Sequence, residues 1–365
     1  MELSPDKAEP DCKDNKGRTP LSYAAEYNSK EVVKLLLYTG KVDPDSKDNE
    51  GRTPLSYAAE WNSKEVVELL LNTGKVDPDS KHNKGRTPLS YAAAVTEYNN
   101  KEVVELLLHT GKVDPDSKDN EGRTPLSYAA EWNSKEVVEL LLHTGKVVPD
   151  SKDNKGRTPL SYAPEYNNKG VVELLLHTGK MDPDSKDNEG RTPLSYAAER
   201  DMKEVVELLL DSGKVDPDSK DNEGRTPLSY AARWGSKEVV ELLLHTGKVD
   251  PDSKDNEGRT PLSYAAARWA GKEVVELLLH TGKVDPDSKD NEGICPLSYA
   301  AAKYNSKEVV ELLLHTGKVD LDSKDNKGRT PLFYAAEYNS KEVVEVLLHT
   351  VKVDPDSKGN EGMTP

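Results

Sequence analysis

Histidine is the residue type in this chain that could most readily bind a metal or act as a general base. Seven of the eight histidines recur at one position of a repeated block. Successive blocks would be separated by a helix-packing distance of about 10 Å, whereas zinc needs its ligands within about 2 Å of the ion. The pattern therefore does not predict a metal site. These histidines are His109, His143, His177, His245, His280, His315 and His349.

Three further patterns resemble sites of binding or catalysis, and each lacks something essential. The acidic loop DPDSKDNEG differs from an EF-hand because Lys47 stands where an oxygen ligand is needed and Asp48 stands where glycine is needed. The recurrent TGK lacks the upstream glycine of a P-loop. Repeated serines and histidines offer no unique catalytic constellation. We therefore expect no enzyme, no cofactor, no metal and no small-molecule substrate.

Composition and charge narrow the class of protein and its partners. Only 35% of the 365 residues are hydrophobic, which suits a solenoid that buries thin layers better than a conventional core. The net charge of −16 disfavours duplex nucleic acid and anionic membranes. No apolar run approaches the roughly 20 residues of a membrane span, and the charged start MELSPDKAEPDC is not a secretory signal. We expect an intracellular, cytoplasmic protein.

The block TPLSYAA recurs through the whole chain, usually at intervals of 34 residues. A fixed period of this size indicates a repeat array. We expect one solenoid domain of ten repeats at 19–363, a partial repeat or loop at 1–18, and the start of an eleventh repeat at 364–365. The abrupt ends lead us to expect a segment of a longer protein, or ends that a partner covers. Repeats one to ten open at Thr19, Thr53, Thr87, Thr124, Thr158, Thr192, Thr226, Thr260, Cys295 and Thr330.

Each repeat predicts two helices and a loop. In repeat two, Thr53 can cap a short inner helix, and Pro54 fits the first helical position, where its missing N–H costs nothing. Asn62 tolerates a left-handed turn, and Gly74 ends the outer helix that follows. The remaining VDPDSKDNEG has the composition of a hairpin-like turn. The apolar stripe of the outer helix consists of Val66, Val67, Leu69, Leu70 and Leu71.

The unit GRTPLSYAAEWNSKEVVELLLNTGKVD resembles the ankyrin repeat in its TPL helix start, paired alanines, VVxLLL outer helix and glycine-ended loop. The resemblance covers nearly the whole chain. It implies an all-α fold, a curved superhelical solenoid of ten helix-turn-helix units with hairpin-like loops. Ser56 departs from the family, which usually has histidine there. The chain also resembles the near-identical ankyrin arrays of fungal NOD-like receptors, which implies the sensor region of a larger receptor-like protein.

Variation between the copies concentrates in the two residues before the Asn turn. Nine of ten copies place an aromatic at the second of these positions, and all four tryptophans stand there. The ankyrin resemblance implies that this position faces a concave groove where partners bind. Tyr, Trp and Arg dominate binding hot spots, and rungs about 10 Å apart would meet roughly every third residue of an extended peptide. The predicted ladder is Tyr27, Trp61, Tyr98, Trp132, Tyr166, Arg200, Trp234, Trp269, Tyr304 and Tyr338.

The first of the two positions changes its charge along the chain. It is Glu in repeats one to six and ten, and it is basic in repeats seven to nine, as Arg233, Arg268 and Lys303. Together with Arg200 these residues place four cations on consecutive repeats. A partner with acidic or phosphorylated residues would be attracted there, since arginine pairs with such groups through two parallel hydrogen bonds.

These features predict a non-enzymatic scaffold that binds a partner protein or an extended peptide. Two alternatives stay open. In the first, the array is an architectural spacer without a specific ligand, and its aromatics cover helix edges. In the second, it binds single-stranded nucleic acid on stacked Trp and Arg.

Repeat five departs from the other copies in ways that weaken its helices. Pro164 falls inside the inner helix, where its missing N–H costs about 3 kcal/mol. Gly170 replaces a helix-favouring Glu in the outer helix. We therefore expect repeat five to be a soft point or hinge. Cys295 likewise removes a capping threonine from repeat nine.

Overall fold

The computed structural model describes residues 9–94, 100–163, 168–268, 271–302 and 306–350. These residues form twenty helices in successive pairs and include no strand, which confirms the predicted all-α repeat fold. Their contacts group into two compact units, residues 1–182 and 183–365. That all ten repeats form a single domain stays a prediction.

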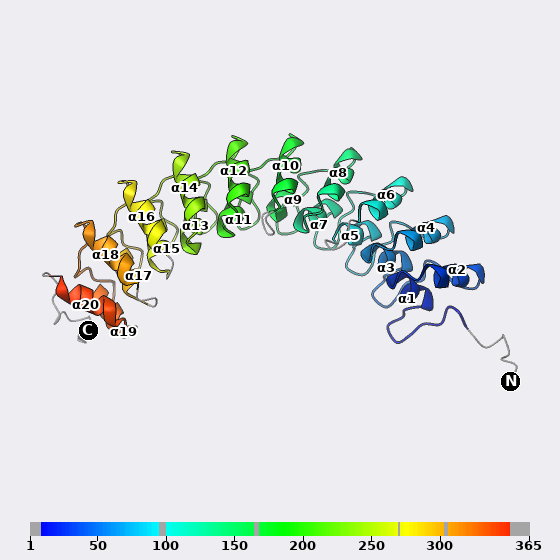
Figure 1. Ribbon diagram of the computed structural model, residues 1–365, viewed down its shortest axis with the longest axis horizontal. Coiled ribbons are helices and arrows are strands. Elements are labelled where there is room, and N and C mark those ends of the chain that lie inside the picture. Colours follow the sequence, from blue (N-terminus) through cyan, green and yellow to red (C-terminus); the bar gives the residue numbers. More distant parts are fainter. Residues whose placement is uncertain (1–8, 95–99, 164–167, 269–270, 303–305, 351–365) are drawn as a thin grey trace. The chain divides into compact units, whose positions relative to one another are not determined.

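In every repeat a short inner helix precedes an outer helix of nine residues (Figure 1). The inner helices of the first unit are α1 (Pro20–Glu26), α3 (Pro54–Glu60), α5 (Pro88–Ala93), α7 (Pro125–Glu131) and α9 (Pro159–Tyr162). Its outer helices are α2 (Lys30–Tyr38), α4 (Lys64–Asn72), α6 (Lys101–His109), α8 (Lys135–His143) and α10 (Lys169–His177). The inner helices of the second unit are α11 (Pro193–Glu199), α13 (Pro227–Trp234), α15 (Pro261–Ala266), α17 (Pro296–Ala301) and α19 (Pro331–Glu337). Its outer helices are α12 (Lys203–Asp211), α14 (Lys237–His245), α16 (Lys272–His280), α18 (Lys307–His315) and α20 (Lys341–His349).

Each unit has two layers, because inner helices pack against neighbouring inner helices and outer helices against neighbouring outer helices. The core lies between the layers. In α4, Val66, Val67 and Leu70 are fully buried, whereas Leu69 and Leu71 are only half-buried. The apolar stripe is therefore narrower than the sequence predicted.

The predicted ends of the helices are confirmed. The Thr53 Oγ1 accepts a hydrogen bond of 3.2 Å from the Ser56 backbone N–H, and the Ser56 Oγ accepts one of 3.4 Å from the Thr53 N–H. Serine at the position of the family's usual histidine thus completes a capping box. Asn62 and Gly74 adopt left-handed conformations, with φ of 51° and 68°. Cys295 forms no side-chain cap, as expected.

The loops between repeats are tied to one another along each unit. The Lys118 Nζ donates a hydrogen bond of 2.8 Å to the Lys152 carbonyl, 34 residues further on. The Asn154 Nδ2 donates one of 2.9 Å to the Asn120 carbonyl of the preceding loop. These ties, which the residue pattern did not predict, give the DSKDNEG segment a structural reason to vary little between copies.

Repeat five has the shortest of the described helices. Helix α9 spans four residues, whereas the other inner helices span six to eight. Pro164 lies outside the described residues. Helix α10 keeps nine residues although it contains Gly170. The hinge at repeat five stays a prediction.

Candidate binding surface

The aromatic residues of the predicted ladder lie at the C-terminal ends of the inner helices. Tyr27, Trp61, Trp132 and Tyr338 are the C-cap residues of α1, α3, α7 and α19, and Trp234 is the last residue of α13. Their exposed fractions are 73%, 50%, 36%, 48% and 51%, respectively. Because at least a third of each residue is accessible to solvent, core packing does not account for these aromatics.

The charged members of the surface differ in their exposure. Arg200 is the exposed C-cap residue of α11, Arg233 is exposed on α13, and Arg268 is half-buried. Five predicted members lie outside the described residues, namely Tyr98, Tyr166, Trp269, Lys303 and Tyr304.

Arginines just before the inner helices stack on tyrosines of those helices, an arrangement that the residue pattern did not predict. The Arg52 Cζ lies 3.9 Å from the ring centre of Tyr57 in its own repeat and 4.6 Å from that of Tyr91 in the next. A cation over an aromatic face contributes about 0.5 to 2 kcal/mol. The near-invariance of this Arg and Tyr among the copies was the available signal. The same double stacking occurs at Arg18, Arg86, Arg123 and Arg191.

An acidic residue of the preceding loop also fixes the stacked tyrosines, except Tyr91, whose ring meets His82 instead. The Tyr57 hydroxyl donates a hydrogen bond of 2.6 Å to the Asp48 Oδ2. Burial, together with this bond to a carboxylate, raises the pKa of Tyr57 well above its usual value. The hydroxyl therefore stays protonated and remains a donor.

Among the described residues, the Glu at the first variable position has an internal partner in five repeats. In repeat ten, the Glu337 Oε2 lies 3.5 Å from the Nη1 of Arg329, whose side chain is 26% exposed. In the other four repeats, the Glu forms an ion pair with the arginine that opens the same repeat, and the side chain of that arginine is only 11–14% exposed. In these four repeats the Glu therefore neutralises a nearly buried cation of its own repeat. The pairs are Arg18–Glu26, Arg52–Glu60, Arg123–Glu131 and Arg191–Glu199.

Repeats seven and eight lack this carboxylate. Arg233 occupies the position in repeat seven. In repeat eight Ala267 occupies it, because this repeat has one extra residue, and Arg268 follows one place later than the sequence predicted. The arginine that opens repeat eight pairs with other carboxylates. The Arg259 Nε lies 2.9 Å from the Asp255 Oδ2, and the Arg259 Nη1 lies 2.7 Å from the Glu257 Oε2.

These replacements produce a basic pocket of about 320 Å³ in the second unit. Arg233, Arg259 and Arg268 line it, together with aromatic residues that include Trp234 and Tyr264. The Arg268 Cζ lies 4.7 Å from the Trp234 ring centre, and the Arg268 Nε donates a hydrogen bond to the Arg233 carbonyl. The structure thus brings three of the predicted site residues together: Arg233, Trp234 and Arg268.

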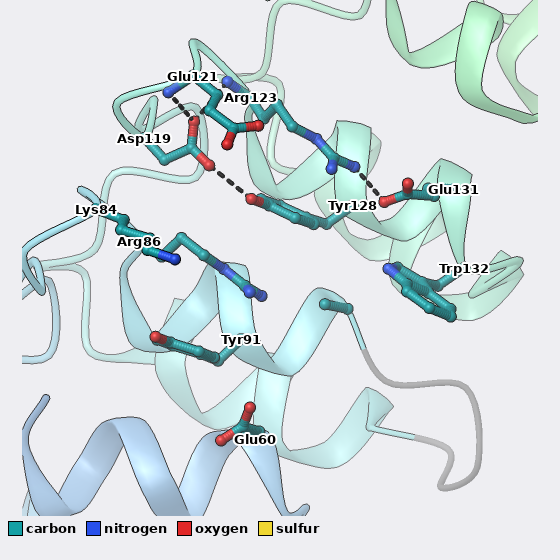
Figure 2. A pocket seen from close by; sticks show the side chains of 11 residues that line it. Glu60, Lys84, Arg86, Tyr91, Asp119, Glu121, Arg123, Tyr128, Glu131 and Trp132 are labelled. Atoms are coloured by element: carbon teal, nitrogen blue, oxygen red, sulfur yellow. Dashed lines mark hydrogen bonds and ion pairs between the residues drawn. The ribbon is translucent and has the colours of Figure 1, made fainter. Parts of the chain in front are cut away.

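A corresponding pocket of about 480 Å³ in the first unit has a different charge (Figure 2). Figure 2 shows Arg86 between the rings of Tyr91 and Tyr128, while Glu131 pairs with Arg123. Four carboxylates line this pocket, namely Glu60, Asp119, Glu121 and Glu131.

The geometry gives no convergent metal ligands within the described ranges, where no three His, Cys, Asp or Glu side chains could hold one ion. His109 directs its Nδ1 to the Glu105 carbonyl, at 2.7 Å. In the same part of the chain, no helix is long and apolar enough to cross a membrane.

The helix pairs, their caps and their loop ties define a helical repeat protein. A family model described as ankyrin repeats (3 copies) matches residues 2–81, 73–151, 146–221, 213–290 and 266–358. The chain therefore belongs to the ankyrin-repeat family. A comparison with curated proteins gave no match. Ankyrin repeats are generally scaffolds for protein–protein interaction and are typically not catalytic.

Proposed function

We propose that this chain is a non-enzymatic scaffold that binds a partner protein or an extended peptide across the ends of its inner helices. The Tyr, Trp and Arg ladder supplies the contacts. The observation that carries the proposal is the exposure of five aromatics at equivalent positions, Tyr27, Trp61, Trp132, Trp234 and Tyr338. Exposed aromatics in a regular array are characteristic of binding surfaces, where each contributes about 2 kcal/mol or more once desolvated.

The basic residues of the second unit favour a partner with acidic or phosphorylated groups. Arg233 and Ala267 occupy the position that is Glu in most other repeats, and Arg268 follows directly. Arg200 is exposed on the repeat before Arg233. The resemblance to the arrays of fungal NOD-like receptors favours the same surface as the sensor region of a larger receptor-like protein.

The experiment is a selection from a displayed library of random peptides on the whole chain. Selected peptides are then measured against a variant that combines Trp61→Ala and Trp132→Ala. Tyr38→Ala is the matched control, because Tyr38 is 92% exposed at the end of an outer helix.

The double variant is expected to lose most of its affinity while its thermal unfolding changes little, since both rings are partly solvated. The control should bind as the original chain does. A large loss of stability would instead assign the two tryptophans to packing and favour the spacer function. Equal binding by all three proteins would refute the ladder.

A further inference from the structure

The lining of the pocket in repeats seven to nine combines several cations with aromatic walls. Arg233, Arg259 and Arg268 contribute guanidinium groups, and Trp234, Tyr264 and Tyr299 contribute rings. None of its described lining residues is a carboxylate, although Arg259 pairs with Asp255 and Glu257 beside it, whereas four carboxylates line the corresponding pocket of the first unit. The two pockets share their place on the repeat, and two of the carboxylates are replaced: Arg233 stands at the position of Glu60, and Ala302 at that of Glu131.

The sequence change that creates the pocket removes an internal anion. In repeat six, Glu199 forms an ion pair with Arg191 and thereby occupies the Nη2 of that arginine. In repeat eight, Arg259 instead reaches Glu257, whose side chain is 68% exposed. An ion pair of this exposure contributes little to stability, so an incoming anion can compete with Glu257 for Arg259.

Two contacts with the preceding repeat fix the side chain of Arg268 in an orientation that suits an anion. Its Nε donates to the Arg233 carbonyl, and its guanidinium lies over the Trp234 ring. These two contacts fix the plane of the group, and the described residues offer its Nη atoms no further hydrogen bond or ion pair. The terminal nitrogens of a fixed guanidinium suit a group with several acceptor oxygens.

We propose that this pocket binds the phosphoryl group of a phosphorylated side chain in the partner segment, an inference that rests on the function proposed above. Arg233 and Arg268 provide the charge-assisted hydrogen bonds, Arg259 adds charge, and Trp234 contacts the apolar part of the side chain. A phosphoryl group carries a charge of about −1.5 to −2 and three acceptor oxygens, which matches three arginines better than a single carboxylate does.

The net negative charge of the whole chain favours a ligand whose own negative charge is confined to one group. A net charge of −16 repels a polyanion over its whole length, whereas one phosphoryl group interacts mainly with the pocket. This argument favours a phosphorylated segment over single-stranded nucleic acid.

The test measures binding of four fluorescent peptide pools to the whole chain. The pools have degenerate flanks and a central phosphotyrosine, phosphoserine, tyrosine or glutamate. The first variant is Arg233→Glu, which restores the residue that repeat six has at this position as Glu199. The matched control is Lys248→Glu, the same charge change at an exposed loop position of the same repeat.

The original chain is expected to prefer at least one phosphorylated pool over the glutamate pool. Arg233→Glu should weaken that binding roughly tenfold or more, since it removes a charge-assisted bond and adds repulsion. Lys248→Glu should change it less than twofold. Should Arg233→Glu unfold the protein, which its melting curve reveals, Arg268→Ala provides the same comparison.

Several results would overturn the assignment. These are equal binding of phosphorylated and glutamate pools, no binding of any pool, equal loss in the variant and its control, or stronger binding of an oligonucleotide. Displacement by inorganic phosphate at the peptide's own concentration would assign the pocket to a free anion. Failure of the proposed function is measured separately, by comparing the binding of the unphosphorylated library peptides to the original chain and to the variant with Trp61→Ala and Trp132→Ala.

Discussion

Two glycines of one repeat allow the contribution of contacts between repeats to be separated from that of backbone conformation. Gly122 and Gly145 both have positive φ, at 78° and 67°. A Cβ added at Gly145 would meet no heavy atom within 4 Å. A Cβ added at Gly122 would lie 2.7 Å from the Asn154 Oδ1 and 2.9 Å from the Asn154 N of the next repeat. Only the second substitution disturbs the stacking of repeats.

The expected costs follow from these distances. Gly145→Ala imposes a left-handed alanine, which costs about 1–2 kcal/mol, and it recovers about 0.4–1 kcal/mol from the less flexible unfolded chain. Gly122→Ala adds overpacking of about 1–3 kcal/mol. It also strains the bonds from the Asn154 N to the Glu121 carbonyl and from the Asn154 Nδ2 to the Asn120 carbonyl. Its total cost should reach about 3 kcal/mol or more, against about 1 kcal/mol for Gly145→Ala.

Hydrogen exchange of backbone amides is the suitable assay, because a repeat array can open locally and need not unfold in one step. The opening free energy of α7 and of the loop that carries Asn154 should fall further in Gly122→Ala than in Gly145→Ala. Equal effects of the two substitutions would refute the argument that the close approach between loops holds neighbouring repeats together.

Two further predictions concern pH and the fifth repeat. Burial raises the pKa of Asp79 to about 6, so the folded chain takes up this proton before the unfolded chain does, and its contribution to stability rises as pH falls from 7 towards 4. Asp79→Asn should therefore raise the melting temperature at pH 7 with a gain that shrinks by pH 4; a pH-independent difference would contradict this. In repeat five, Gly170→Glu should slow amide exchange in α10 by about 1 kcal/mol of opening free energy, since glycine is disfavoured in helices. Faster opening in repeats two and four than in repeat five would contradict the predicted hinge at repeat five.

The interior of each repeat was predictable because local chemistry decides it. Threonine followed by proline fixes a helix start, and the structure shows the cap at Thr53. Asn62 and Gly74 adopt left-handed backbone as their types predict. The half-burial of Leu69 and Leu71 was not predictable from periodicity, since burial depends on contacts with neighbouring helices that the spacing of residues does not specify.

The candidate site was predictable only in part. Comparing the copies identified the exposed aromatics, since their identity varies where the surrounding repeat does not. It did not identify the partners of the neighbouring charges. Glu131 and Arg123 are eight residues apart, and nothing in the spacing says that their side chains meet across a turn and a helix.

The sequence by itself determined the repeat, its helices, their caps and the positions at which the copies differ, because these depend on residues close together in the chain. Only the tertiary structure decided which charges remain available to a ligand. Arg52 meets a tyrosine of its own repeat and one of the next, and Arg268 meets Trp234 of the preceding repeat. Such contacts follow from the stacking of one repeat on another, which sets distances through space that the order of residues does not specify.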